Sequence, residues 1–555
     1  MTKIEYSQWP AGVPKSLPVA SHTLDDNLRA VTKVTPDKTA LIFYGATKSY
    51  AQLNDEVTRV AAYLQSVCGI QKGDRVGIYM QNSVQFVAAF YGIIRAGGIV
   101  VPINPMHKKD ELTYLCQDAA IRTVLTAQDI VANAASLLET GVLDHVIAAH
   151  YGSELPNGNS VDVPDIVTSG PTQYPEDVIG WSVMMTADVT FVPVKLSPED
   201  CCILPYTSGS TGRGKGCKHT HQTALHGVGC IQEWFAYTGD EVHLGATPMF
   251  HIVGMQGVMN VAIATGATIA IMSRWDRNAA AAIIAQNRVS DWATVPTAVI
   301  DLLNTEGLVA EDLASMRLIY GGGSAMPEAV AKRLDDLTGL KFVEVYGMTE
   351  TMGPVTHNPM DAPKAGCVGI PVMNTKLRLL DPETLVPVPV GEVGEVVISG
   401  PQVMQGYWEN SSADAEALIT IDGAQYLRTG DLAYADADGN IHIVDRLKRM
   451  INASGYKVWP AEVEARLYQH PAIAEACIIS TKDDYRGEAV KAVVVLRQGA
   501  DLDAQELTTW AKDHMAAYKV PRLLDVVESL PKSAAGKVLW RQLQDEEDAR
   551  AKETP

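Results

Sequence analysis

A glycine- and hydroxyl-rich stretch near the middle of the chain limits the possible functions most strongly. Residues 203–216 read ILPYTSGSTGRGKG. Glycines let the backbone curl so that its N–H groups point at an anion, and a lysine adds positive charge. The stretch therefore predicts a phosphate-binding loop, with these candidate residues: Thr207, Ser208, Gly209, Ser210, Thr211, Gly212 and Lys215.

Two kinds of phosphate loop fit parts of this stretch. Residues 209–215 satisfy the G-x-x-x-x-G-K pattern of nucleoside triphosphatases. That pattern requires a Ser or Thr after the lysine to hold magnesium, but Gly216 follows here. The hydroxyl side chains instead precede Lys215. The order of residues therefore favours a different type of phosphate loop.

Length and charge restrict the class of protein. A chain of 555 residues suggests three or four folding units, and 47% hydrophobic with 20% charged residues is an ordinary globular composition. The net charge of −20 argues against a nucleic-acid-binding surface, because phosphate backbones require clustered Lys and Arg. We therefore expect small-molecule substrates and no nucleic acid.

The cysteines and the apolar segments indicate the compartment. The eight cysteines contain no C-x-x-C pair, which predicts reduced thiols in a cytoplasmic protein. The start of the chain shows no signal peptide. The most apolar window, Met255 to Met272, contains Gln256 and Asn260, so we expect a buried helix followed by a core strand and no transmembrane segment.

Alternating apolar patterns predict an α/β fold with parallel strands. Residues 1 to about 45 contain four prolines and are expected to be irregular. Strand and helix patterns then alternate, with helices expected at 50–64, 83–96 and 221–234. From about Leu377 short alternating strands predict a small β subdomain, and a last α/β unit follows Asp445.

Further motifs carry groups that could bind a nucleotide. A strand ends in Tyr346-Gly347-Met348-Thr349-Glu350, and a carboxylate at a strand end suits a largely hydrated magnesium. Gly321-Gly322-Gly323 permits close approach of a flat ring. Asp431, which follows Thr429-Gly430, could accept hydrogen bonds from the two neighbouring hydroxyls of a ribose. Taken singly, each motif also fits a turn or a helix start.

Together these motifs resemble the adenylate-forming superfamily of acyl-CoA synthetases, peptide-synthetase adenylation domains and luciferases. The resemblance covers residues 30 to 541, with the motifs in the family order. It implies a large N-terminal domain (1–445) of stacked mixed and parallel sheets with helices and a small β subdomain. A hinge (446–449) and a mobile α+β C-terminal domain (450–555) are expected to follow. The family usually has proline where this chain has Gly214, which predicts a more mobile loop.

The resemblance also implies roles for individual residues. Glu350, with Thr211, would bind Mg²⁺, Thr349 would meet the α-phosphate and Tyr346 would pack on adenine. Gly321, Gly322, Gly323, Gly347 and Met348 would border the nucleotide. Asp431 would bind the ribose hydroxyls with help from Arg446. Lys448 would be the hinge residue, and Gly455 and Tyr456 would meet the pantetheine arm of CoA. Lys537, in the closing motif, would be the catalytic lysine.

The implied reaction is the activation of a carboxylic acid by ATP. Acid and MgATP would give acyl-AMP and pyrophosphate, and CoA would then displace AMP. His251 would flank the substrate carboxylate, and Trp234 and Met255 are further candidates for the acyl pocket. Their apolar character favours a medium- or long-chain fatty acid. An aryl or alicyclic acid, transfer to a carrier protein, a non-catalytic binding module and a luciferase-like oxygenase are the alternatives, and a homodimer is left open.

Overall fold

Two large sheets form the body of the molecule in the computed structural model, which describes residues 9–156, 162–171, 173–207, 214–453, 456–483, 487–533 and 537–553. Within these residues the larger sheet is parallel at its centre and antiparallel at its two ends. In spatial order its strands are β16 (Ile370–Pro371), β15 (Gly353–His357), β14 (Phe342–Met348), β13 (Leu318–Gly321), β12 (Asp291–Thr294), β10 (Val242–Gly245), β11 (Thr268–Ile271), β1 (Thr39–Phe43) and β2 (Ala46–Ser49).

The second sheet is parallel except at β9, which pairs antiparallel with β8. Its strands, in order, are β7 (Val178–Gly180), β6 (His145–Ala149), β5 (Thr123–Ala127), β3 (Arg75–Tyr79), β4 (Ile99–Ile103), β8 (Cys201–Ile203) and β9 (His219–Thr220). Strand β8 leads into the glycine-rich stretch, and β9 follows it. The loop therefore leaves and re-enters the sheet at neighbouring strands.

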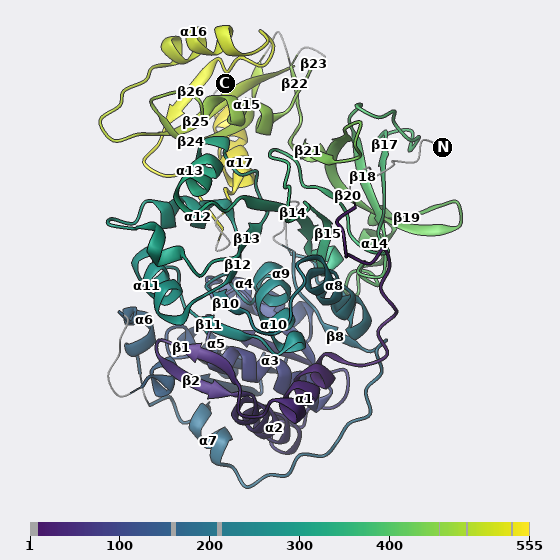
Figure 1. The fold of residues 1–555 in the computed structure, drawn as a ribbon, viewed down its shortest axis with the longest axis vertical. Helices are drawn as coiled ribbons and strands as arrows, with labels where there is room; N and C mark the ends of the chain where they lie inside the picture. The colour runs from purple at the N-terminus through teal and green to yellow at the C-terminus, as the bar shows by residue number, and fades with distance from the viewer. Residues whose placement is uncertain are drawn as a thin grey trace.

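Helices cover and separate the two sheets (Figure 1). They are α1 (Leu24–Val34), α2 (Tyr50–Ser66), α3 (Val84–Ala96), α4 (Lys109–Asp118), α5 (Val131–Glu139), η1 (Tyr151–Glu154), α6 (Asp165–Thr168), α7 (Trp181–Thr186), α8 (His221–Trp234), α9 (Ile252–Gly254), the π-helix η2 (Met255–Asn260), α10 (Val261–Thr265), α11 (Arg277–Asn287), α12 (Pro296–Leu303), η3 (Ala310–Leu313), α13 (Glu328–Thr338) and η4 (Thr349–Thr351). Every residue of α3 is buried, and one hydrophobic core joins it to both sheets. An apolar surface all round is typical of such an enclosed helix.

Local capping explains several helix boundaries. Ser49, Ser83 and Thr220 each accept a backbone N–H of the first turn of α2, α3 and α8. Gly97 ends α3 in the left-handed conformation. The helices predicted at 50–64, 83–96 and 221–234 are confirmed, as are the buried helix and strand predicted within 255–272.

The prediction that residues 1 to about 45 are irregular is wrong. They contain α1 and β1, and β1 pairs with β11 inside the larger sheet. The prolines flank these elements instead of interrupting them: Pro18 precedes α1 and Pro36 lies between α1 and β1. Asp26 caps the start of α1, because its Oδ2 accepts the Thr23 N–H at 2.8 Å and the Thr23 hydroxyl at 2.8 Å.

A β subdomain and a C-terminal unit lie beside each other above the two large sheets (Figure 1). The subdomain comprises β17 (Lys376–Leu380), β18 (Gly394–Ser399), α14 (Ser411–Ala417), β19 (Leu418–Ile421), β20 (Ala424–Ala435) and β21 (Ile441–Arg446). The C-terminal unit comprises η5 (Leu447–Arg449), β22 (Ile451–Ala453), β23 (Tyr456–Val458), α15 (Pro460–Leu467), β24 (Ile473–Asp483), β25 (Gly487–Leu496), α16 (Ala504–His514), β26 (Leu523–Val526) and α17 (Trp540–Glu553). The expected α/β class with these parts is confirmed by the observed sheets and helices.

The segment predicted as a hinge, 446–449, spans the last residue of β21 and all of η5. It connects the β subdomain to the C-terminal unit, while rotation about it stays a prediction. All eight cysteines, each within the described part of the chain, are free thiols. None of the helices in the described ranges has the length and apolar character needed to cross a membrane.

Candidate functional site

A cavity of about 470 Å³ opens where the larger sheet, the β subdomain and the C-terminal unit meet. It brings together residues that are hundreds of positions apart in sequence. The predicted site residues that line it are Thr207, Lys215, His251, Gly322, Gly323, Tyr346, Gly347, Met348, Thr349, Glu350, Arg446, Lys448 and Lys537. Most of the predicted nucleotide site is therefore assembled in one place.

The base of the glycine-rich loop is held by paired backbone contacts. Thr207 donates its N–H to the Lys215 carbonyl at 2.9 Å, and its hydroxyl accepts the Lys215 N–H at 3.1 Å. These bonds fix both ends of the loop at the cavity wall. The predicted residues Ser208, Gly209, Ser210, Thr211 and Gly212 lie outside the described residues, as does Gly455. Tyr456 begins β23 in the C-terminal unit.

Gly214 occupies a position with little space for a side chain. A β-carbon added there would lie 2.7 Å from the carbonyl oxygen of Thr207. The Gly214 carbonyl accepts a hydrogen bond from the Tyr114 hydroxyl at 3.1 Å. The absence of a side chain thus allows the two ends of the loop to approach each other closely.

The glycine turn after β13 also depends on close backbone approach. A β-carbon on Gly321 would lie 1.6 Å from the Thr294 carbonyl oxygen, and one on Gly322 would lie 2.1 Å from the Val345 carbonyl oxygen. Gly321 itself is not part of the cavity lining, because it lies within the sheet. Only glycine fits these positions, so Gly322 and Gly323 present bare backbone to the cavity.

Asp431 connects three strands on one side of the cavity. In the pairing of β20 with β21 it lies directly opposite Arg446, whose Nε is 2.9 Å from Asp431 Oδ1. The hydroxyl of Tyr346, from β14, donates to Asp431 Oδ2 at 2.6 Å. Burial, followed by the nearby Asp431 charge, raises the pKa of Tyr346 well above its usual value. Tyr346 therefore stays a neutral hydrogen-bond donor.

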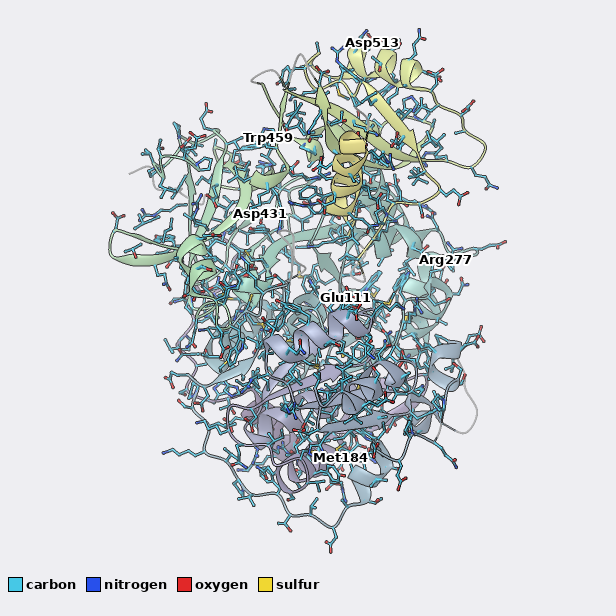
Figure 2. The ribbon with its side chains drawn as sticks, turned by 180° about the vertical axis from the view of Figure 1, so that it is seen from behind. Glu111, Met184, Arg277, Asp431, Trp459 and Asp513 are labelled. Atoms are coloured by element: carbon cyan, nitrogen blue, oxygen red, sulfur yellow. The ribbon has the colours of Figure 1, made fainter. Side chains whose placement is uncertain are left out.

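The boundary beside Asp431 is bridged by a further contact. Asp445, at the end of β21, accepts the backbone N–H of Ala461 in α15 at 2.7 Å. Figure 2 shows Asp431 below Trp459, where the β subdomain meets the C-terminal unit. The end of β21 therefore contacts the C-terminal unit. Arg446, its last residue, and Lys448, in the adjoining η5, both line the cavity.

Lys537 reaches the cavity from the C-terminal unit. Its side chain lies over Gly323, where an added β-carbon would be only 2.7 Å from Lys537 Cε. Lys537 keeps solvent-exposed surface, but the protein around its ammonium group partly desolvates it, and this effect, followed by the nearby Arg446 charge, lowers the pKa of Lys537. A cation close to a glycine turn at the cavity suits the stabilisation of negative charge that develops during a reaction.

Glu350 lies in η4, on the side of the cavity nearest the loop. Its carboxylate accepts a hydrogen bond from the Tyr407 hydroxyl at 3.0 Å. Removal from bulk solvent raises the pKa of this carboxyl group. Within the described residues no three His, Cys, Asp or Glu side chains form a metal cluster. Glu350 is thus one of three carboxylates that line the cavity, together with Glu395 and Glu416, and none of them belongs to such a cluster in the described residues.

The predicted acyl-pocket residues divide into two groups. His251 lines the cavity, and burial lowers its pKa to about 4, so its imidazole is neutral near pH 7. Trp234 and Met255 are buried behind the lining, and Trp234 donates its indole N–H to the Asn358 carbonyl at 2.8 Å. The cavity wall beside them is formed by Ile231, Ile252, Val253, Gln256, Gly257, Val295, Tyr320 and His357.

Several residues that shape the site were not predicted from the sequence. Tyr407 and Trp540 line the cavity but belong to no motif noted in the sequence, whereas Arg428 lines it from the segment that precedes Asp431. His219 supports Thr349, because its Nε2 lies 2.8 Å from the Thr349 carbonyl oxygen. In η2 the π-helical geometry changes side-chain directions, so α-helical periodicity could not identify Gln256 as the inward residue.

The fold and cavity together define an adenylate-forming type of enzyme. The family model described as AMP-binding enzyme matches residues 28–408, and that described as AMP-binding enzyme C-terminal domain matches residues 462–537. The chain therefore belongs to the AMP-binding enzyme family, and the predicted superfamily is confirmed.

Three similar proteins illustrate this membership. The chain is 34% identical over 552 residues to the long-chain-fatty-acid–CoA ligase of Bacillus subtilis (strain 168), covering 98% of this chain and 97% of the relative. It resembles the structure of the anthranilate CoA ligase AuaEII with anthranoyl-AMP, with a TM-score of 0.85, 26% identity, and 97% and 99% coverage. It also resembles ATP-bound MatB from Rhodopseudomonas palustris, with a TM-score of 0.84, 26% identity, and 96% and 100% coverage.

His219 makes stability depend on pH. It is fully buried, and burial lowers its pKa to about 4 from 6.5. The contribution of His219 to the free energy of unfolding is complete above pH 6.5 and decreases as the pH falls towards 4. In this range the unfolded chain binds a proton at His219 that the folded chain does not. Between pH 7 and pH 5 we expect a loss of about 2 kcal/mol of unfolding free energy from this residue.

Urea denaturation of the wild type and His219→Gln at pH 7 and pH 5 measures this loss. We expect the difference in unfolding free energy between the wild type and His219→Gln to be about 2 kcal/mol smaller at pH 5 than at pH 7. The exposed His22, changed to Gln, is the matched control and should follow the wild type. If this difference in unfolding free energy is the same at both pH values, His219 is not the cause of the pH dependence.

Proposed function

We propose that this protein activates a fatty acid with ATP and transfers the acyl group to CoA, releasing AMP and pyrophosphate. The observation that carries the proposal is the convergence of Lys215, Glu350, Arg446 and Lys537 on one cavity. Family membership and the names of the full-length relatives support the same reaction.

The nucleotide would occupy the cavity between the loop and the β subdomain. Thr207, Lys215 and the residues 208–212 would hold the phosphates through backbone N–H groups and charge. The bare backbone at Gly322, Gly323 and Gly347 leaves room for the flat base beside Tyr346 and Met348. Asp431 would accept from the ribose hydroxyls while Arg446 holds its orientation.

The residues present fit a bound magnesium ion. Mg²⁺ is commonly bound through one or two carboxylates together with substrate phosphates and water, and Glu350 offers one carboxylate at the wall near the loop. Glu350 would hold the ion together with Thr211. Bound magnesium would supply neutralisation of phosphate charge, and Lys215 would add to it from the protein.

The first reaction needs orientation and charge stabilisation. The carboxylate of the acid is already a nucleophile at neutral pH, so no general base is required. An oxygen of the acid forms a bond to the α-phosphorus, and the bond to pyrophosphate breaks. Lys537 would stabilise the added negative charge, with Thr349 at the α-phosphate. The neutral His251 would flank the carboxylate without forming a competing ion pair.

The second reaction requires a different arrangement of the C-terminal domain. We propose that residues 450–555 turn about the hinge 446–449, at Lys448, relative to residues 1–445. This rotation would withdraw Lys537 and bring Gly455 and Tyr456 to the site for CoA. The thiol of CoA releases its proton to solvent, its sulfur forms a bond to the acyl carbon, and AMP leaves with the electrons of the broken bond.

The wall next to His251 supports an apolar acid. Ile231, Ile252, Val253 and Val295 contribute aliphatic side chains to this part of the cavity. An aliphatic wall favours the alkyl chain of a monocarboxylic acid through apolar burial. A fatty acid of medium or long chain length is therefore the proposed substrate.

Incubation of the protein with ATP, Mg²⁺ and a panel of fatty acids, with and without CoA, tests this function. We expect acid-dependent pyrophosphate release and, only when CoA is present, the matching acyl-CoA. Pyrophosphate release without any acyl-CoA would favour a carrier protein as acceptor. If no acid stimulates pyrophosphate release, the proposed function is wrong.

The substitution Lys537→Ala should separate the two reactions. Loss of the charge beside Gly323 should slow pyrophosphate release by about a hundredfold or more. Thioester formation from chemically synthesised acyl-AMP and CoA should remain close to the wild-type rate. Lys532→Ala, which removes a surface ion pair with Glu475, is the control for a nearby lysine. If Lys537→Ala releases pyrophosphate at the wild-type rate, Lys537 is not the catalytic lysine of the first reaction.

A further inference from the structure

The segment from Met404 to Trp408 connects the glycine-rich loop to Glu350. The Met404 N–H donates to the Glu350 carbonyl at 2.8 Å, and the Trp408 N–H donates to the Gly216 carbonyl at 2.7 Å. Between them, the Lys218 N–H donates to the Gly406 carbonyl at 2.9 Å. Backbone hydrogen bonds thus hold this segment against both parts of the predicted phosphate site.

Tyr407 is the residue of this segment whose side chain contacts two groups of the site. Its hydroxyl donates to Glu350 Oε1 at 3.0 Å. The Lys215 Nζ lies 4.9 Å from the centre of its ring. Tyr407 is only 7% exposed, and its own N–H donates to Asp414 Oδ1 at 2.6 Å. The ring is therefore fixed between the lysine and the carboxylate.

We propose that Tyr407 is a positioning residue that orients Glu350 and Lys215 together for a metal-bound triphosphate. This inference rests on the proposed function, because it assigns partners to the ATP in that site. All three side chains line the same cavity. The hydroxyl fixes one oxygen of the Glu350 carboxylate, and the ring face holds the lysine ammonium near the base of the loop.

Elementary energetics make both contacts useful. A carboxylate has several rotamers, and a hydrogen bond to a charged group is stronger than one between neutral groups. A lysine side chain loses much conformational freedom when it binds phosphate, so a contact that already restricts it reduces this loss. An aromatic face attracts an ammonium ion without neutralising its charge. Tyr407 would thus prepare both groups while leaving their charges available.

The two contacts can be separated by substitution. Tyr407→Phe removes the hydroxyl and leaves the ring under Lys215. It should therefore change the orientation of the Glu350 carboxylate and leave that of Lys215 unchanged. Tyr407→Leu removes the ring as well and should affect the lysine too. Tyr174→Phe removes a hydroxyl that donates to the Ala149 carbonyl and is not in the cavity lining, so it is the matched control.

Two binding measurements on the full chain distinguish these effects without turnover. Electron paramagnetic resonance of Mn²⁺, used in place of Mg²⁺, measures metal binding to the protein–ATP complex. Calorimetry with ATP and a chelator measures nucleotide binding without metal. We expect Tyr407→Phe to weaken Mn²⁺ binding about tenfold and to leave metal-free ATP binding unchanged. Tyr407→Leu should in addition weaken metal-free ATP binding about threefold.

The outcomes separate this inference from the function on which it rests. If the wild type binds neither ATP nor Mn²⁺, the proposed function is wrong. If it binds both, and Tyr407→Phe binds Mn²⁺ as tightly as the wild type, the inference about Tyr407 alone is overturned. Equal weakening of metal-free ATP binding in Tyr407→Phe and Tyr407→Leu would also overturn it, since the hydroxyl would then act on more than Glu350.

Discussion

The site depends on the buried carboxylate of Asp431, which accepts a hydrogen bond from the Tyr346 hydroxyl and pairs with the partly exposed Arg446. This one group ties β14 of the larger sheet to β20 and β21, two adjacent strands of the β subdomain. A carboxylate removed from water is costly unless it is paired and hydrogen-bonded, and both conditions are met here. The paired charges leave Lys537 as a separate cation that faces the cavity from the C-terminal unit.

Close backbone contacts hold the opposite wall. Gly321 and Gly322 pack against the carbonyl groups of neighbouring strands, and Gly323 lies under the side chain of Lys537. A larger residue at these positions would separate the strands or displace the lysine. The glycines, which have no side chain, therefore shape the cavity as much as its polar groups do. The geometry of this wall follows from the parallel pairing of β12, β13 and β14.

Local signals made much of this structure predictable. Caps and apolar periodicity located α2, α3 and α8, and motifs located most residues at the cavity. Helix α1 was not predicted, because in the sequence alone prolines that flank a helix cannot be told from prolines that interrupt one. Tyr407 and His219 were not predicted either, because their partners, Glu350 and Thr349, are 57 and 130 positions away. Contacts over such distances arise from topology, which the local pattern of residues does not record.

Distant segments of this chain together form one binding site for a nucleotide. A crystal structure with a non-hydrolysable acyl-AMP analogue tests it most directly. We expect the ribose to contact Asp431, the phosphate to lie within reach of Thr349, and the acyl group to lie beside His251. An analogue bound elsewhere, with Asp431 and Thr349 both free of contact with it, would contradict the account.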